Sequence, residues 1–138
     1  MSTDDGSQFA QMLELDPRNY KYIPDNILAG LERYAAGSPV GDFLTAVFSN
    51  LLTEAVGRAD AHSMRALPAI VCYVYNEMPP NCHGSRAVHD AWLQLHDAKR
   101  RGASDDEIQK RTRVTFLHKQ LAHRWRSGDV GLPNEDSP

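Results

Sequence analysis

The chain has 138 residues, of which 41% are hydrophobic and 24% are charged, and its net charge is −3. A chain of this length buries roughly two-thirds of its unfolded surface when it folds as one domain, so one hydrophobic core is expected. This ordinary composition argues against a disordered or fibrous protein, and no apolar run approaches the roughly 20 residues that a membrane span needs.

The N-terminal residues and the cysteines indicate the compartment. Met1 to Gly6 are polar and acidic, whereas a secretory signal is basic and then apolar. We therefore expect a soluble protein of the cytoplasm with no membrane partner. In a reducing cell Cys72 and Cys82 are expected to be free thiols, because two cysteines are too few for a disulfide framework.

Three regions are expected along the chain. Residues 1–22 show little periodicity and predict a loosely structured N-terminal arm. Its apolar residues Phe9, Met12 and Leu15 could dock this arm on the domain. Residues 23–127 predict a single all-α domain, a compact bundle of five or six short helices. Residues 128–138 predict a disordered acidic tail.

Apolar residues at helical spacing predict the first two helices. The first begins with Pro24 at its first position, carries Ile27 and Leu31, and ends at Gly37. The second gives the strongest helical pattern in the chain, with Asp42 as its expected N-cap. Its apolar stripe comprises Phe43, Leu44, Val47, Phe48, Leu51, Leu52, Ala55 and Val56.

The middle of the chain predicts a short helix over residues 61–67 and another that starts at Pro68 and ends at Pro79. The run Ile-Val-Cys-Tyr-Val-Tyr over residues 70–75 is also typical of a strand. No second segment looks like its pairing partner, and a lone strand would leave its backbone groups unpaired. We therefore expect a helix here.

A basic helical hairpin is expected over residues 85–127. Ser85 caps its first helix, which carries Val88 and Trp92 and ends at Gly102. The string Ser-Asp-Asp-Glu over residues 104–107 is a capping box that opens the second helix. The apolar stripe predicted for that second helix comprises Val114, Leu117, Leu121 and Trp125.

Charge is divided along the chain. Residues 1–80 contain ten acids and five bases, a balance of −5, whereas residues 96–127 contain nine bases and four acids, a balance of +5. Such asymmetry bears on surface potential and partners rather than on the fold.

Several short strings carry a family resemblance. They include Ile23-Pro24, Gly30-Leu31, Arg33-Tyr34, Phe43-Leu44-Thr45-Ala46-Val47, Asn50-Leu51, Ala55-Val56, Arg58-Ala59-Asp60, Tyr75-Asn76, Gly84-Ser85 and Trp92. Over about residues 23–95 the chain resembles a group of short helical proteins encoded by bacteriophages, prophages and plasmids. The resemblance implies a bacterial cytoplasm during infection or carriage of a mobile element. It implies no activity, cofactor or catalytic residue, and the basic segment departs from it.

The best enzyme-like feature is Cys82 beside His83, just before a predicted helix. Amides at a helix N-terminus and an adjacent imidazolium favour a thiolate, but no third orienting residue is identifiable. The alternative is a small buried cysteine in a turn. A zinc site built from Cys82, His83 and His89, with Cys72 or His62 added by folding, lacks the usual ligand spacing. We therefore expect no enzyme, metal or cofactor, and rank a thiol enzyme third.

The candidate partner-binding residues are Lys99, Arg100, Arg101, Lys110, Arg111, Arg113, Lys119, Arg124, Trp125 and Arg126. Cations on neighbouring helices can follow a phosphate backbone, and an indole can stack a base. A helix-turn-helix is not favoured, because Arg113 stands where its turn glycine belongs.

The leading hypothesis is a non-enzymatic phage or mobile-element accessory protein that binds a host or phage protein. A nucleic-acid-binding regulator is the alternative. The basic face could also be ordinary solvated surface, balanced by the acidic half or by a second copy in a homo-oligomer.

Overall fold

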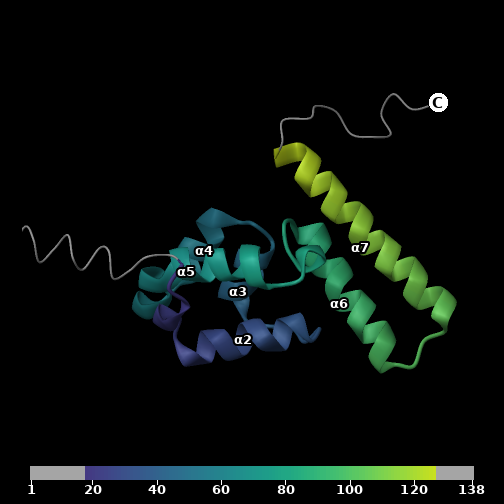
Figure 1. Cartoon of the computed structure of the whole chain (residues 1–138), viewed down its shortest axis with the longest axis horizontal. Coiled ribbons are helices and arrows are strands. Elements are labelled where there is room, and N and C mark those ends of the chain that lie inside the picture. The colour runs from purple at the N-terminus through teal and green to yellow at the C-terminus, as the bar shows by residue number, and fades with distance from the viewer. Residues whose placement is uncertain (1–17, 127–138) are drawn as a thin grey trace, which may run out of the picture.

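The computed structural model describes residues 18–126, with side chains as far as His123. In this range the chain is all-α, with six α-helices, two short 3-10 helices and no strand, which confirms the predicted fold class. The elements are η1 (Tyr20–Tyr22), α2 (Asp25–Ala35), α3 (Asp42–Phe48), α4 (Leu52–Arg58), α5 (Ala61–Glu77), η2 (Pro80–Cys82), α6 (Arg86–Arg100) and α7 (Asp105–Arg126) (Figure 1). None of these helices combines the length and apolar character that crossing a bilayer requires.

The N-terminal arm and the C-terminal tail lie mostly outside the described residues. Residues 1–17 and the whole of 128–138 fall there. The end of the predicted arm is described, and there Tyr20–Tyr22 form η1. Tyr20 meets the Tyr73 ring of α5 edge-on, with 5.2 Å between centroids, and its hydroxyl donates to Glu77 (3.1 Å). The described chain therefore begins beside α5.

Helices α2 to α5 form one end of the molecule, and the α6–α7 hairpin forms the other (Figure 1). The hairpin turns at Gly102, whose φ of +74° favours glycine. The Gly102 N–H donates to the Lys99 carbonyl, and the Ala103 N–H donates to the Ala98 carbonyl. These two bonds close the end of α6 in the glycine-terminated pattern that the sequence predicts.

Tyr34 joins the two ends of the molecule. Its side chain is fully buried and its ring stacks on Phe48 of α3, with 3.8 Å between centroids. Its hydroxyl donates to the Cys82 carbonyl (2.7 Å), and its own carbonyl accepts from Trp92 Nε1 (2.8 Å). One residue of α2 thus holds α3, η2 and α6 together.

The prediction of one continuous helix after Asp42 is wrong, because the chain breaks between α3 and α4. Asn50 has a φ of +61° and ends α3. Its N–H donates to the Val47 carbonyl, and the Leu51 N–H donates to the Ala46 carbonyl. This pair of backbone hydrogen bonds is a common way for a helix to end. It requires one residue in the left-handed conformation, which asparagine tolerates better than most other residues.

The predicted boundary at Pro68 is also wrong, because α5 runs without interruption from Ala61 to Glu77 with Pro68 inside it. Asp60 caps the helix by accepting from the Ser63 N–H (2.7 Å). A proline there leaves the carbonyl four residues earlier, that of Met64, without its helical donor. Met64 is exposed, so water can serve that carbonyl. The run at 70–75 is helical, as expected, and not a strand.

The apolar stripe predicted for α7 does not form its buried face. Val114 is 43% and Leu117 is 53% exposed, whereas Thr115 is only 1% exposed. The Thr115 hydroxyl donates to the Arg111 carbonyl (2.9 Å) within the helix, so its polar group is satisfied and the residue is buried like a small apolar one. Leu121 is half-buried, and the Trp125 side chain lies outside the described part.

Candidate functional site

Most of the described cations in the predicted basic segment already have partners. Arg101 donates to Asp97 (3.0 Å) and to Glu107 (3.1 Å), and Arg111 donates to the same oxygen of Glu107 (3.1 Å). The hydrogen bonds from Arg111 and Arg101 hold the pKa of Glu107 below its usual range. Ser104 Oγ accepts from the Glu107 N–H, so Ser104 caps α7 as expected while the carboxylate of the box is used for these ion pairs.

Two further cations bind backbone carbonyls of other segments. Arg100 donates to the Gly37 carbonyl (3.1 Å), which ties the end of α6 to the turn after α2. Lys119 Nζ donates to the His83 carbonyl (2.7 Å), which ties α7 to the turn after η2. These side chains therefore have structural roles that their sequence positions did not reveal.

Three of the predicted basic residues remain exposed without an ion pair among the described residues: Lys99, Lys110 and Arg113. The side chains of the last three candidates, residues 124–126, lie outside the described range. In the described part, the predicted basic residues thus divide into four that contact other groups of the chain (Arg100, Arg101, Arg111 and Lys119) and three that are exposed without an ion pair.

Cys82 is fully buried in η2, and burial raises the pKa of its thiol to about 12. At neutral pH the thiol is therefore protonated, which is the opposite of what a nucleophilic cysteine needs. Gly84 has a φ of +133°, and Ser85 Oγ accepts from the Val88 N–H (3.2 Å). These details match the alternative interpretation of a small buried cysteine in a capped turn.

The residues considered for zinc do not converge. Among the residues that the structure describes, no group of three or more His, Cys, Asp or Glu side chains could hold a metal ion. His89 instead stacks on the Tyr34 ring, with 5.6 Å between centroids, and its Nδ1 lies 2.9 Å from Asp90.

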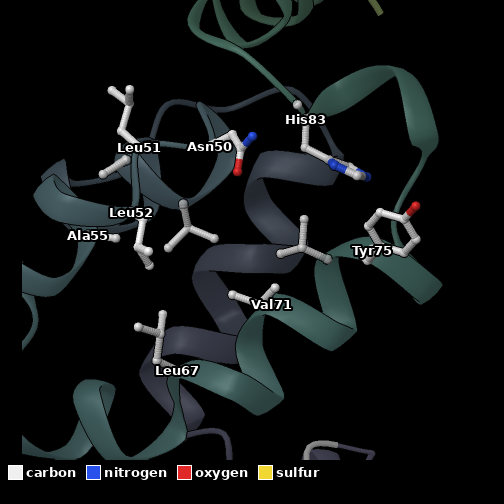
Figure 2. A pocket seen from close by; sticks show the side chains of 12 residues that line it. Asn50, Leu51, Leu52, Ala55, Leu67, Val71, Tyr75 and His83 are labelled. Atoms are coloured by element: carbon white, nitrogen blue, oxygen red, sulfur yellow. The ribbon is translucent and has the colours of Figure 1, made fainter. Parts of the chain in front are cut away.

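An apolar hollow between the α3–α4 corner and α5 was not found from the sequence (Figure 2). We call it the α4–α5 hollow, and its volume is about 210 Å³. Its walls include Val47, Leu52, Leu67, Val71, Tyr75 and His83. Asn50, Tyr75 and His83 place polar groups along its upper edge in Figure 2, and the Tyr75 and His83 rings lie 6.2 Å apart.

Large apolar side chains stay exposed around this hollow. Leu52 is 70%, Tyr75 is 67%, Val71 is 45% and Leu51 is 37% exposed. Single exposed apolar residues are normal, but a cluster at a concave place marks an interaction site. Small-molecule sites usually enclose about 300–1,000 Å³, so this smaller hollow suits one large side chain better than a cofactor.

Asn50 lies at the break between α3 and α4 and lines the hollow. Its left-handed backbone separates α3 from α4. Leu51 is therefore the N-cap and Leu52 the first residue of a second helix, and neither continues the buried apolar stripe of α3. Two signals in the sequence point to this break: an asparagine in mid-stripe, and more apolar residues in that stripe than one helix face can bury.

No protein-family model matches the chain, and neither a curated protein nor a solved structure was found to match it.

Proposed function

We propose that the chain is a non-enzymatic binding protein that holds a partner protein through the α4–α5 hollow. The observation that carries this proposal is the group of exposed apolar side chains, Leu51, Leu52, Val71 and Tyr75, around a recess of about 210 Å³. A protein interface commonly centres on one anchoring side chain in such a recess, with neutral contacts around it.

The chemistry of the hollow defines the expected anchor. Its floor is aliphatic, which favours a Leu, Met or Phe side chain, while the amide of Asn50 and the hydroxyl of Tyr75 can bind backbone groups of the partner. Burying one such side chain is worth about 1.5–3 kcal/mol, or roughly one to two factors of ten in affinity.

The test is capture of a partner by hollow variants of the whole chain. Tagged wild type is compared with Leu52→Glu and Val71→Glu, which place a charge on the wall, and with Met64→Glu. Met64 is 39% exposed and lies on α5, the helix of Val71, but it does not line the hollow, so it is the matched control.

The resemblance of residues 23–95 to phage- and plasmid-encoded proteins supports the use of infected or plasmid-bearing bacterial lysate. We expect a protein that wild type and Met64→Glu retain and that both hollow variants lose. Equal capture by all four proteins, or capture by none, would overturn the proposal.

A second candidate function, nucleic-acid binding, has one observation in its favour. Lys110 and Arg113 are exposed on α7 without an ion pair among the described residues. If they contact phosphates, replacing both with alanine reduces the slope of log affinity against log salt by about two for labelled duplex DNA. An unchanged slope, or no binding by wild type at low salt, removes this candidate.

A further inference from the structure

An open groove lies between η2 and α7, and we call it the η2–α7 groove. Its volume is about 420 Å³, which falls within the range of about 300–1,000 Å³ that small-molecule sites usually enclose. It shares no lining residue with the α4–α5 hollow. It is therefore a separate site, large enough for a small ligand or for one unit of a polymer. Its lining residues are Asn81, Gln109, Thr112, Arg113 and Phe116.

The fold holds both walls of this groove in place. The four residues that α7 contributes have the spacing i, i+3, i+4 and i+7, so they share one side of the helix. The burial of Thr115 and the bond from Lys119 to the His83 carbonyl (2.7 Å) set the rotation of α7, which turns that side towards η2. On the other wall, Asn81 precedes Cys82, which is fully buried. The groove is thus formed before a ligand arrives.

The groove combines an exposed aromatic ring with two side-chain amides. Phe116 is 48% exposed, although Thr115 beside it is buried, so part of its ring is open to a flat ligand. The side-chain amides of Asn81 and Gln109 have no hydrogen bond to any other residue that the structure describes. Each amide offers both a donor and an acceptor, as the edge of a nucleobase does. A flat heterocycle therefore fits the uncharged part of the groove.

Charge then narrows the class of ligand. Arg113 is exposed without an ion pair among the described residues, and the other four lining residues carry no charge. The groove therefore favours an anion. A guanidinium group suits phosphate in particular, because its planar fork donates two parallel hydrogen bonds. We propose that the η2–α7 groove binds one nucleotide unit, with an unpaired base stacked on Phe116 and the phosphate bound to Arg113.

The requirement for an unpaired base distinguishes this site from both functions considered above. Proteins that bind single strands stack bases on aromatic side chains and bind the phosphates with cations, whereas the faces of a base inside a duplex are covered by its neighbours. The site shares Arg113 with the candidate that binds duplex DNA, and it shares nothing with the α4–α5 hollow. A free nucleotide and a single strand present the same base and phosphate, so the experiment includes both.

The experiment measures binding to the full chain at low salt. Fluorescence anisotropy follows three labelled probes: a short DNA single strand of mixed sequence, the same strand with abasic sugars in place of its bases, and its duplex. Calorimetric titration measures adenosine and cytidine monophosphate. Phe116→Ala is matched by Leu117→Ala, since Leu117 is 53% exposed on the same helix but does not line the groove. Arg113→Ala is matched by Lys99→Ala, which removes the same charge from an exposed position of α6.

We expect the single strand to bind more tightly than the abasic strand by about fivefold or more, the least that stacking one base contributes. Phe116→Ala should remove this difference, whereas Phe116→Trp and Leu117→Ala should keep it. Arg113→Ala should reduce the slope of log affinity against log salt by about 0.7 for the single strand, and Lys99→Ala should not. Tighter binding of the strand than of either monophosphate assigns the site to single strands, and the reverse order assigns it to free nucleotides.

Several results would overturn the inference: no binding of the single strand or of either monophosphate, equal binding of the abasic strand or of the duplex, or an affinity that Phe116→Ala leaves unchanged. Should Phe116→Ala fail to fold, as judged by circular dichroism, an unchanged salt slope for Arg113→Ala refutes the site by itself. Leu52→Glu should leave nucleotide binding unchanged, and Phe116→Ala should leave capture of a partner protein unchanged. Failure of this inference and failure of the proposed function are therefore distinguishable.

Discussion

Removing the hydroxyl of Tyr34 should destabilise the fold although it changes no surface. This hydroxyl is buried and donates to the Cys82 carbonyl at 2.7 Å, which links α2 to the turn before α6. Tyr34→Phe deletes that donor and leaves a buried carbonyl without it, while the ring can still stack on Phe48. Such an unsatisfied buried group costs about 1–3 kcal/mol.

We therefore expect Tyr34→Phe to lower the free energy of unfolding by about 2 kcal/mol. In a domain of this size that corresponds to a fall in Tm of roughly 6–10 °C. Urea unfolding followed by tryptophan fluorescence and by far-UV circular dichroism measures the change. The midpoint should fall at an unchanged m-value, because the surface exposed on unfolding is almost the same.

Tyr75→Phe is the matched control. Tyr75 is 67% exposed, so removing its hydroxyl should change stability by less than about 0.5 kcal/mol. If Tyr34→Phe proves as stable as Tyr75→Phe, then Tyr34 is not the residue that joins the two ends of the molecule.

Three further predictions test other parts of the fold. Gly37→Ala should destabilise the fold by about 1 kcal/mol or more, since Gly37 has a φ of +96° and a Cβ there would overlap the His96 ring. Thermal melts should show the opposite for Gly57→Ala, whose Cβ would meet nothing within 4 Å and which should stabilise α4 by about 0.5–1 kcal/mol. The free energy of unfolding should fall from about pH 9 towards pH 12, since the unfolded chain releases the Cys82 proton in this range and the folded chain, with its thiol pKa at about 12, retains it. Urea unfolding at several pH values should show a flatter decline for Cys82→Ala, and an equal decline would contradict the raised pKa of this thiol. Thr115→Asp should destabilise the fold by more than about 2 kcal/mol and Leu117→Asp by less than about 1 kcal/mol, because Thr115 is buried and Leu117 is half exposed. Denaturant melts that give the reverse order would mean that the apolar stripe, and not Thr115, forms the buried face of α7.

Four of the helix ends were predictable because they depend on local chemistry. Gly37 and Gly102 end their helices with positive φ, and Ser85 and Ser104 each accept a backbone N–H three residues later. Each of these features needs only a few neighbouring residues, so a single sequence reveals them. The all-α class follows from the same local patterns together with apolar spacing.

The basic segment was less predictable because counting charges does not identify their partners. Residues 96–127 contain nine bases and four acids, yet a single acid, Glu107, binds both Arg101 and Arg111. Lys119 reaches a carbonyl 36 positions earlier in the chain. Pairings across a hairpin depend on how its two helices are rotated against each other, and the buried position of Thr115 shows that hydrophobic spacing did not specify that rotation.

The wrong prediction over residues 43–56 and the candidate site have the same cause. A stripe of apolar residues has the same spacing whether it forms one helix or two, so periodicity cannot locate a single residue with positive φ within it. At Asn50 that residue separates α3 from α4 and turns Leu51 and Leu52 outward. Had the stripe formed one straight helix, both leucines would be expected in the core with Leu44 and Phe48. The break therefore leaves apolar surface uncovered beside α5, and a fold gains nothing for its own stability from such exposure. Local patterns that the tertiary structure overrides tend to lie at functional or strained sites, which supports the proposal that the α4–α5 hollow binds a partner.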